Sequence, residues 1–195
     1  MHDPAGLLER TRAQWARREE HWVFAYGSLI WRPEFDAAER RDAQVHGWHR
    51  ALRLRSRVNR GSPERPGLVF ALLSGGSCRG VVYRVRREQA AEEFERLWAR
   101  EMPMAVYHPR WLPCRTPQGL VQALSFTLDR RSEACAPPLA DEELLDIMRH
   151  ARGRCGRSLD YLVETTRALR EHGLRDREVD RLMRLLQREG LLAAA

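Results

Sequence analysis

The chain changes from strand-forming to helix-forming sequence near residue 138, and this division constrains its fold more than any other feature. Before that point, apolar runs separated by Gly, Pro, Asn and Ser predict about six short strands and one internal helix. After it, the segments 141–151, 158–173 and 176–190 show the 3.6-residue spacing of amphipathic helices. This order predicts an α+β protein with a small mixed sheet or barrel, not a doubly wound sheet.

The predicted strands are bounded by turn-forming residues. Gly75 and Gly76 predict a turn between two of them, while Pro109 and Pro113 confine another to an edge or a bulge. In the tail, Ser158 and Asp176 are expected to cap helices, and Gly173 to end one. The predicted strands cover residues 22–26, 45–56, 68–73, 80–86, 105–115 and 120–129.

We expect one domain over residues 1–195, since this length fits a single core. Residues 1–20 read as a polar helical extension, and residues 139–195 as C-terminal helices that pack on the strands. No apolar run reaches the length of a membrane span, and the first residues lack the apolar region of a secretory signal. We therefore expect a cytoplasmic protein with no membrane partner, while the sequence leaves the oligomeric state open.

The charge pattern argues against a nucleic-acid partner. The formal net charge is +7, but the positive excess is all arginine, scattered among acidic residues without interleaved aromatics. Cys78, Cys114, Cys135 and Cys155 lie far apart, which indicates neither structural zinc nor a disulfide framework. His46 and His49 are three apart on a predicted strand and point to opposite faces, so we expect no metal site there.

Glu101 is the most informative candidate for chemistry. In the helix before Pro103, the residues Ala90, Phe94, Leu97 and Trp98 form one apolar stripe, and Glu101 continues it. Burial and the negative end of the helix dipole both disfavour a carboxylate, so both raise its pKa toward that of a general base. An ion pair with a neighbouring arginine is the alternative explanation.

The segment Tyr26–Gly27–Ser28–Leu29 begins at the last residue of the first predicted strand. Gly27 allows close approach to the backbone, whose N–H groups could bind an anion, although most Tyr-Gly-Ser turns are only turns. Neither a phosphate-binding loop nor a serine-hydrolase elbow is present. Tyr161, on a C-terminal helix, could close a pocket with its hydroxyl or belong to the core.

Taken together, VFAYGSLIWRPEF, VHGWHRALRL, RGVVYRVR, LWAREM and DYL resemble the ChaC-type γ-glutamylcyclotransferases of bacterial type, from about Trp22 to the C-terminal helices. The resemblance implies a small mixed β-barrel flanked by helices. It implies release of 5-oxoproline and cysteinylglycine from reduced glutathione, without a cofactor. It also implies that Tyr26, Gly27, Ser28 and Leu29 form the substrate-binding loop and that Glu101 is the catalytic acid/base.

We further assign Arg50, Tyr107 and Tyr161 to the pocket wall. Two alternatives stay open. One is a cyclotransferase for another γ-glutamyl amino acid or amine, and the other is a non-catalytic binding or regulatory protein. A nucleic-acid-binding protein comes third.

Overall fold

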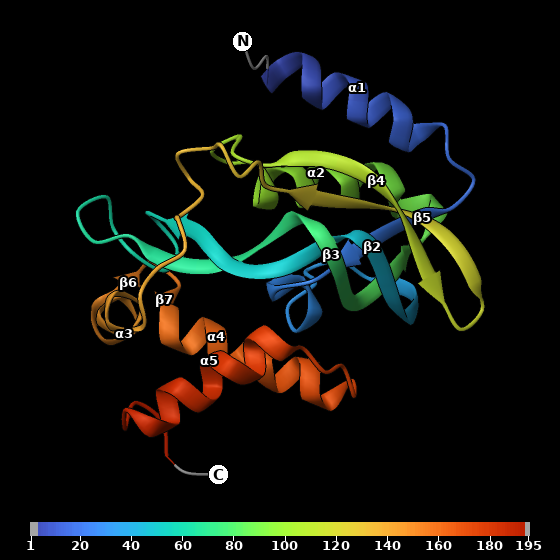
Figure 1. Cartoon of the computed structure of the whole chain (residues 1–195). Helices are drawn as coiled ribbons and strands as arrows, with labels where there is room; N and C mark the ends of the chain where they lie inside the picture. Colours follow the sequence, from blue (N-terminus) through green and yellow to red (C-terminus); the bar gives the residue numbers. More distant parts are fainter. Residues whose placement is uncertain (1–3, 194–195) are drawn as a thin grey trace.

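Five strands of the computed structural model, which describes residues 4–193, close a barrel (Figure 1). They run in the order β1-β3-β2-β4-β5, and β1 closes the barrel against β5 in parallel, while the other pairs are antiparallel. The expected mixed barrel is therefore confirmed, with five strands where about six were predicted. The strands are β1 (His21–Ala25), β2 (Ala37–Ser56), β3 (Gly67–Val85), β4 (His108–Thr116) and β5 (Gly119–Thr127).

The predicted turn at Gly75–Gly76 is wrong, because β3 continues through both residues. Their φ angles of 97° and 72° bend the strand without ending it. On the partner strand β2, the register shifts between His46 and Trp48, where Gly47 has a φ of 79°. The two long strands thus bend together at glycines, as paired strands do at bulges.

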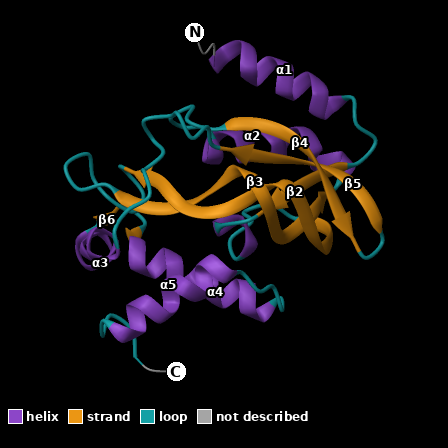
Figure 2. Cartoon of the chain, in the orientation of Figure 1, coloured by secondary structure: helices purple, strands orange, loops and turns teal. Residues whose placement is uncertain are grey.

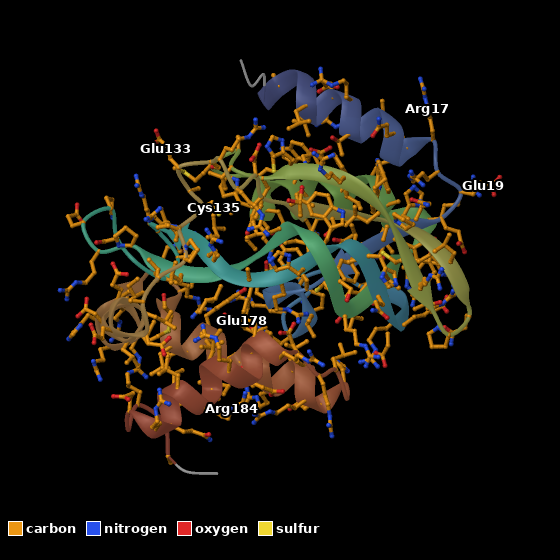
Figure 3. All side chains as sticks on the ribbon, in the orientation of Figure 1. Arg17, Glu19, Glu133, Cys135, Glu178 and Arg184 are labelled. Atoms are coloured by element: carbon orange, nitrogen blue, oxygen red, sulfur yellow. The ribbon has the colours of Figure 1, made fainter. Side chains whose placement is uncertain are left out.

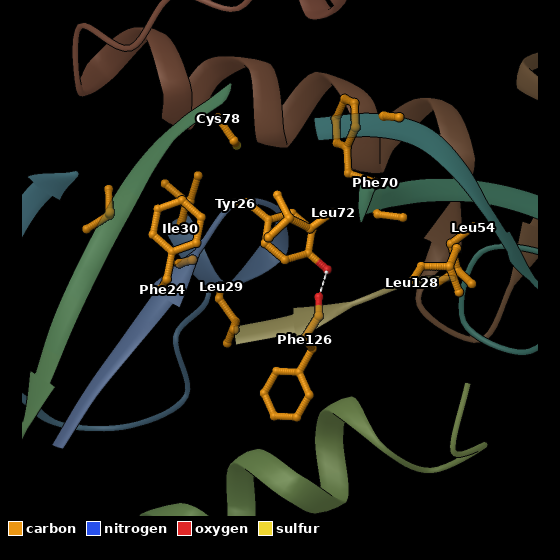
Figure 4. Close-up of a cluster of buried hydrophobic side chains, with 14 of the residues drawn as sticks. Phe24, Tyr26, Leu29, Ile30, Leu54, Phe70, Leu72, Cys78, Phe126 and Leu128 are labelled. Carbon is orange, nitrogen blue, oxygen red and sulfur yellow. Dashed lines mark hydrogen bonds between the residues drawn. The ribbon is translucent and has the colours of Figure 1, made fainter. Parts of the chain in front are cut away.

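Apolar side chains from every strand fill the barrel. Figure 4 shows part of this cluster around Phe24, Tyr26, Leu72 and Phe126, all of them buried. Over Pro109 and Pro113, β4 pairs only with β5, because its pairing with β2 is confined to Cys114 and Arg115. This agrees with the edge position that the prolines predict.

Helices cover two opposite sides of the barrel (Figures 1 and 2). On one side, α1 (Pro4–Ala16) lies over α2 (Ala90–Glu101): the Trp15 indole donates a 2.8 Å hydrogen bond to the Ala90 carbonyl and packs on Phe94. The predicted N-terminal helix is therefore present and packs on α2. The other side carries α3 (Asp141–His150), α4 (Ser158–Glu171) and α5 (Arg177–Arg188).

Short elements complete the chain. They are the 3-10 helices η1 (Ser28–Ile30) and η2 (Arg87–Gln89), and a two-stranded sheet of β6 (Arg152–Gly153) and β7 (Gly156–Arg157).

Two of the three predicted helix-end signals are confirmed. The Asp176 carboxylate accepts the N–H groups of Glu178 and Val179 at 3.0 and 3.2 Å, so it caps α5. Gly173, with a φ of 64°, follows the end of α4. The prediction for Ser158 is wrong: it is the first residue of α4, and its hydroxyl accepts the Leu68 N–H at 2.8 Å. It joins α4 to β3 instead.

Charged side chains gather on the outside of the molecule. Arg17, Glu133 and Arg184, labelled in Figure 3, are all exposed. Within residues 4–193, we find no helix with both the length and the apolar composition that a membrane crossing requires.

Candidate active site

Glu101 is the last residue of α2, as its position before Pro103 predicts. Ala90, Phe94 and Leu97 are buried along the apolar stripe, and the Glu101 side chain, which continues it, is only 15% exposed. Burial raises the pKa of Glu101 above its ordinary value, the neighbouring Arg100 opposes this rise, and the negative charge of Glu34 adds to it. The carboxylate is therefore both a poorly solvated group and a member of an ion pair.

Arg100 connects Glu101 to the turn that follows β1. Its Nε lies 3.1 Å from Oε1 of Glu101, and its Nη1 lies 3.0 Å from a carboxylate oxygen of Glu34. Its Nη2 donates a 3.1 Å hydrogen bond to the Ser28 hydroxyl, and the guanidinium also donates to the Arg32 carbonyl. One arginine thus holds the end of α2 against η1.

Residues Tyr26–Leu29, called the turn below, run from the end of β1 at Ala25 into the first two residues of η1. The Ile30 N–H donates to the Gly27 carbonyl at 3.0 Å, which is the first hydrogen bond of η1. The N–H groups of Ser28 and Leu29 precede that bond and have no acceptor within the helix. Leu29 is 6% exposed and belongs to the core cluster of Figure 4. The backbone N–H groups of this turn are therefore more available for hydrogen bonds to a ligand than the Leu29 side chain is for contact with one.

Three buried tyrosines, Tyr26, Tyr107 and Tyr161, lie within the electrostatic influence of Glu101. The Tyr26 hydroxyl donates a 2.8 Å hydrogen bond to the Phe126 carbonyl (Figure 4), and it also interacts with the Tyr107 hydroxyl. Burial is the main cause that raises the pKa of each tyrosine, to about 12 for Tyr161, and the Glu101 charge raises each further. All three hydroxyls therefore stay protonated near neutral pH.

Tyr161 lies directly against the turn. A Cβ atom added to Gly27 would come within 2.8 Å of its hydroxyl oxygen, which also accepts the Phe70 N–H at 3.2 Å. The structure thus brings together Glu101, the turn and the three tyrosines.

Arg50 has a different position, because its side chain is 0% exposed. Its Nε donates to the Tyr26 carbonyl and its Nη2 to the Arg79 carbonyl, each at 2.6 Å, while its Nη1 pairs with Asp176. All three guanidinium nitrogens of Arg50 therefore have partners within the protein. A direct contact of Arg50 with a ligand stays a prediction.

Sequence reasoning missed Glu34, which has a φ of 59° and pairs with Arg100. Nothing in the local pattern marks it, whereas the Arg100–Glu101 pair is visible in the sequence. Two open surface cavities, of about 370 and 340 Å³, lie beside Trp31 and Trp48, and Glu101 lines neither. In the part of the chain that the structure describes, no three His, Cys, Asp or Glu side chains gather as a metal site would require.

Comparisons with known proteins agree on one family. Residues 21–189 match the family model described as ChaC-like protein. The chain is 33% identical over 156 residues to the glutathione-specific gamma-glutamylcyclotransferase of Escherichia coli (strain K12), covering 80% of this chain and 68% of that protein. It is 32% identical to glutathione-specific gamma-glutamylcyclotransferase 1 of Rattus norvegicus, covering 73% and 66%. The chain thus spans about two thirds of the length of these relatives.

Among solved structures, the chain is similar to a yeast gamma-glutamyl cyclotransferase specific to glutathione. The TM-score is 0.80 at 20% identity, covering 91% of this chain and 100% of that one. At this level of identity the likeness establishes the fold, a barrel flanked by helices.

Proposed function

The chain belongs to the ChaC-like protein family, and from this membership and the surroundings of Glu101 we propose that it is a glutathione-specific γ-glutamylcyclotransferase. Such a lyase releases 5-oxoproline and cysteinylglycine from reduced glutathione. One observation carries the proposal. A carboxylate with a raised pKa, 15% exposed, lies at a helix end beside the backbone turn that follows β1.

The reaction needs a base more than it needs a nucleophile from the protein. The α-amine of the glutamyl group attacks its own side-chain carbonyl and closes a five-membered lactam, while the bond to the cysteine nitrogen breaks. At neutral pH the amine is mostly an ammonium, so a base must first take its proton. Glu101 takes this proton and then gives it to the cysteine nitrogen as that nitrogen leaves, which restores the carboxylate. The ring nitrogen loses a second proton as the lactam forms, and the released amine takes up one proton from solvent to become the ammonium of cysteinylglycine.

The turn supplies fixed dipoles for the substrate. We assign to the N–H groups of Tyr26–Leu29 the binding of either the glutamyl α-carboxylate or the carbonyl oxygen as it becomes an oxyanion. Arg100 holds the turn and the base at a constant separation, since it bonds to both the Ser28 hydroxyl and Glu101. Tyr107 and Tyr161 remain our candidates for the pocket wall, with protonated hydroxyls that can hydrogen-bond to the substrate.

Nucleophile and electrophile lie in one substrate molecule, so correct folding of that molecule supplies much of the rate acceleration. This chemistry requires neither metal nor organic cofactor. We propose that residues 1–195 act as one domain. We also propose a cytoplasmic location, because a reducing compartment keeps both glutathione and the four free cysteine thiols of this chain reduced.

The test compares Glu101→Gln with Glu93→Gln in an assay for 5-oxoproline by mass spectrometry. Glu93 is a matched control, because it is also a buried glutamate on α2 but pairs with Arg96. Removing the base is expected to lower kcat by about 10²–10⁴-fold, whereas Glu93→Gln keeps most of the activity. Near-normal turnover by a folded Glu101→Gln variant contradicts the mechanism.

Substrate comparison separates the alternatives. Faster turnover of γ-glutamyl-alanine than of glutathione indicates a cyclotransferase for another γ-glutamyl compound. Binding of glutathione without conversion indicates a non-catalytic protein.

A further inference from the structure

Arg50 is a completely buried cation in the wall of the barrel, where β2 pairs with β3. A buried charge is costly unless it is paired and its donors are satisfied. Here Asp176 supplies the opposite charge, and the carbonyls of Tyr26 and Arg79 accept the other two hydrogen bonds. Through Arg50, the Tyr26 carbonyl is therefore linked to Asp176.

The two carboxylate oxygens of Asp176 have different hydrogen-bond partners. Oδ1 accepts the N–H groups of Glu178 and Val179 and caps α5, while Oδ2 pairs with Arg50. The start of α5 is therefore joined to the Tyr26 carbonyl through a single arginine. Figure 1 shows α5 beside α4, on the side of the barrel that faces away from α1.

The contact at the Tyr26 carbonyl has a direct consequence for Gly27. The Tyr26 C=O and the Gly27 N–H belong to one planar peptide group and, with no cis bond in the described chain, point in opposite directions. Fixing the carbonyl on Arg50 therefore fixes the direction of the Gly27 N–H. The Gly27 N–H therefore points away from Arg50. Gly27 itself lies next to Tyr161, since an added Cβ would meet the Tyr161 hydroxyl.

We propose that Arg50 and Asp176 are positioning residues, which orient the Gly27 N–H toward the substrate through the Tyr26 carbonyl, so that substrate binding depends on the ion pair between Arg50 and Asp176. This inference rests on the proposed function. It also changes the role assigned to Arg50, which acts behind the turn and not as a wall of the pocket.

Asp176→Asn is the informative variant. Asparagine is as good a helix cap as aspartate and has the same shape, so the cap of α5 is kept while the charge facing Arg50 is lost. The control is Val179→Ala, which removes a buried side chain from the same turn of α5 without touching Arg50. A third variant combines Arg50→Met with Asp176→Asn and removes both charges. No unpaired charge is then left in the core, but the hydrogen bond to the Tyr26 carbonyl is still missing.

Three measurements are made on each full-length variant: kcat/KM for 5-oxoproline release, Tm, and hydrogen exchange of the peptide covering residues 26–32. We expect Asp176→Asn to lower kcat/KM at least tenfold and to speed exchange in this peptide. We expect Val179→Ala, at a similar loss of Tm, to change kcat/KM less than threefold. The double variant regains Tm but not activity.

The proposal is overturned if kcat/KM follows Tm across all variants, or if the double variant regains both. Hydrogen exchange keeps this test separate from the proposed function. If the wild type releases no 5-oxoproline, the proposed function fails, yet faster exchange at residues 26–32 in Asp176→Asn alone still supports the positioning role. Unchanged exchange there overturns it.

Discussion

The guanidinium of Arg100 lies 3.1 Å from a carboxylate oxygen of Glu101, its neighbour in the chain. Two opposing effects thus act on the proposed base. Burial raises the pKa of Glu101, whereas the positive charge and hydrogen bond of Arg100 lower it, and burial is the larger effect. Glu34, on the far side of Arg100, adds a smaller rise. The pH at which Glu101 becomes active as a base therefore depends first on its burial, and two identifiable side chains, Arg100 and Glu34, adjust it.

Replacing these two side chains is expected to shift the pH profile in opposite directions. A base works when deprotonated, so kcat/KM rises with pH through the pKa of Glu101. Arg100→Gln removes the effect that lowers this pKa and moves the acidic limb to higher pH. Glu34→Gln removes an effect that raises it and moves the limb to lower pH. Rates of 5-oxoproline release measured from pH 4 to 8 give both shifts.

Arg96→Gln is the control for these variants, because Arg96 is a more exposed arginine of α2 that pairs with Glu92 and Glu93. We expect it to leave the limb in place. Shifts of the same sign in Arg100→Gln and Glu34→Gln contradict the electrostatic explanation.

The cysteines are expected to be dispensable for turnover. Cys78, Cys114 and Cys135 are buried, and burial raises the pKa of Cys114 to about 12, so its thiol is not a nucleophile at neutral pH. Changing all four cysteines to alanine should keep kcat within about twofold, with a stability loss of about 1 kcal/mol for each buried position. Loss of turnover in a folded Cys114→Ser variant counts against a mechanism that uses only Glu101.

The position of Glu101 at the end of a helix was predictable from local sequence, because the apolar stripe and the following proline lie within a few residues of it. The cap at Asp176 was predictable for the same reason. The order of the segments predicted a small mixed sheet or barrel, and the family resemblance implied a barrel flanked by helices. The apolar stripe of α2 overestimated the burial of Trp98, which is only partly buried. These features depend on residues that lie close together in the chain.

Features that depend on distant partners were not predictable. β2 begins at Ala37, within a charged segment that shows no strand alternation, because pairing with β3 extends it there. Gly75 and Gly76 resemble a turn locally but bend a strand whose partner bends at Gly47. Arg50 and Asp176 are 126 residues apart, so only the folded chain shows that Arg50 is used inside the protein.

Gly27→Ala is expected to impair turnover because of one close contact. The new Cβ would lie 2.8 Å from the Tyr161 hydroxyl oxygen, so either the turn or Tyr161 must move. We expect kcat/KM to fall at least tenfold. Tyr161→Phe removes that oxygen, so the double variant should lose less activity than the two single variants predict. Full additivity in this double-mutant cycle contradicts the contact, and circular dichroism checks that each variant is folded.

Glu101→Gln is expected to be more stable than the wild type at neutral pH. The folded protein raises the pKa of Glu101 above its ordinary value of 4.5, so between those two values the folded state binds more protons than the unfolded state. The free energy of unfolding therefore falls as pH rises through this window, and the full penalty remains above it. Glutamine carries no charge and escapes the penalty.

The measurement is Tm for wild type and Glu101→Gln from pH 4 to 8, with Glu93→Gln as the control. The Tm advantage of Glu101→Gln should be smallest near pH 4, grow as pH rises, and then level off. An advantage that is constant with pH indicates a packing effect of the amide. An advantage that shrinks as pH rises means that Glu101 is stabilised as an anion by Arg100, and that its burial does not raise its pKa. A catalytic carboxylate that lowers the stability of the folded protein is an example of the trade-off between stability and activity at an active site.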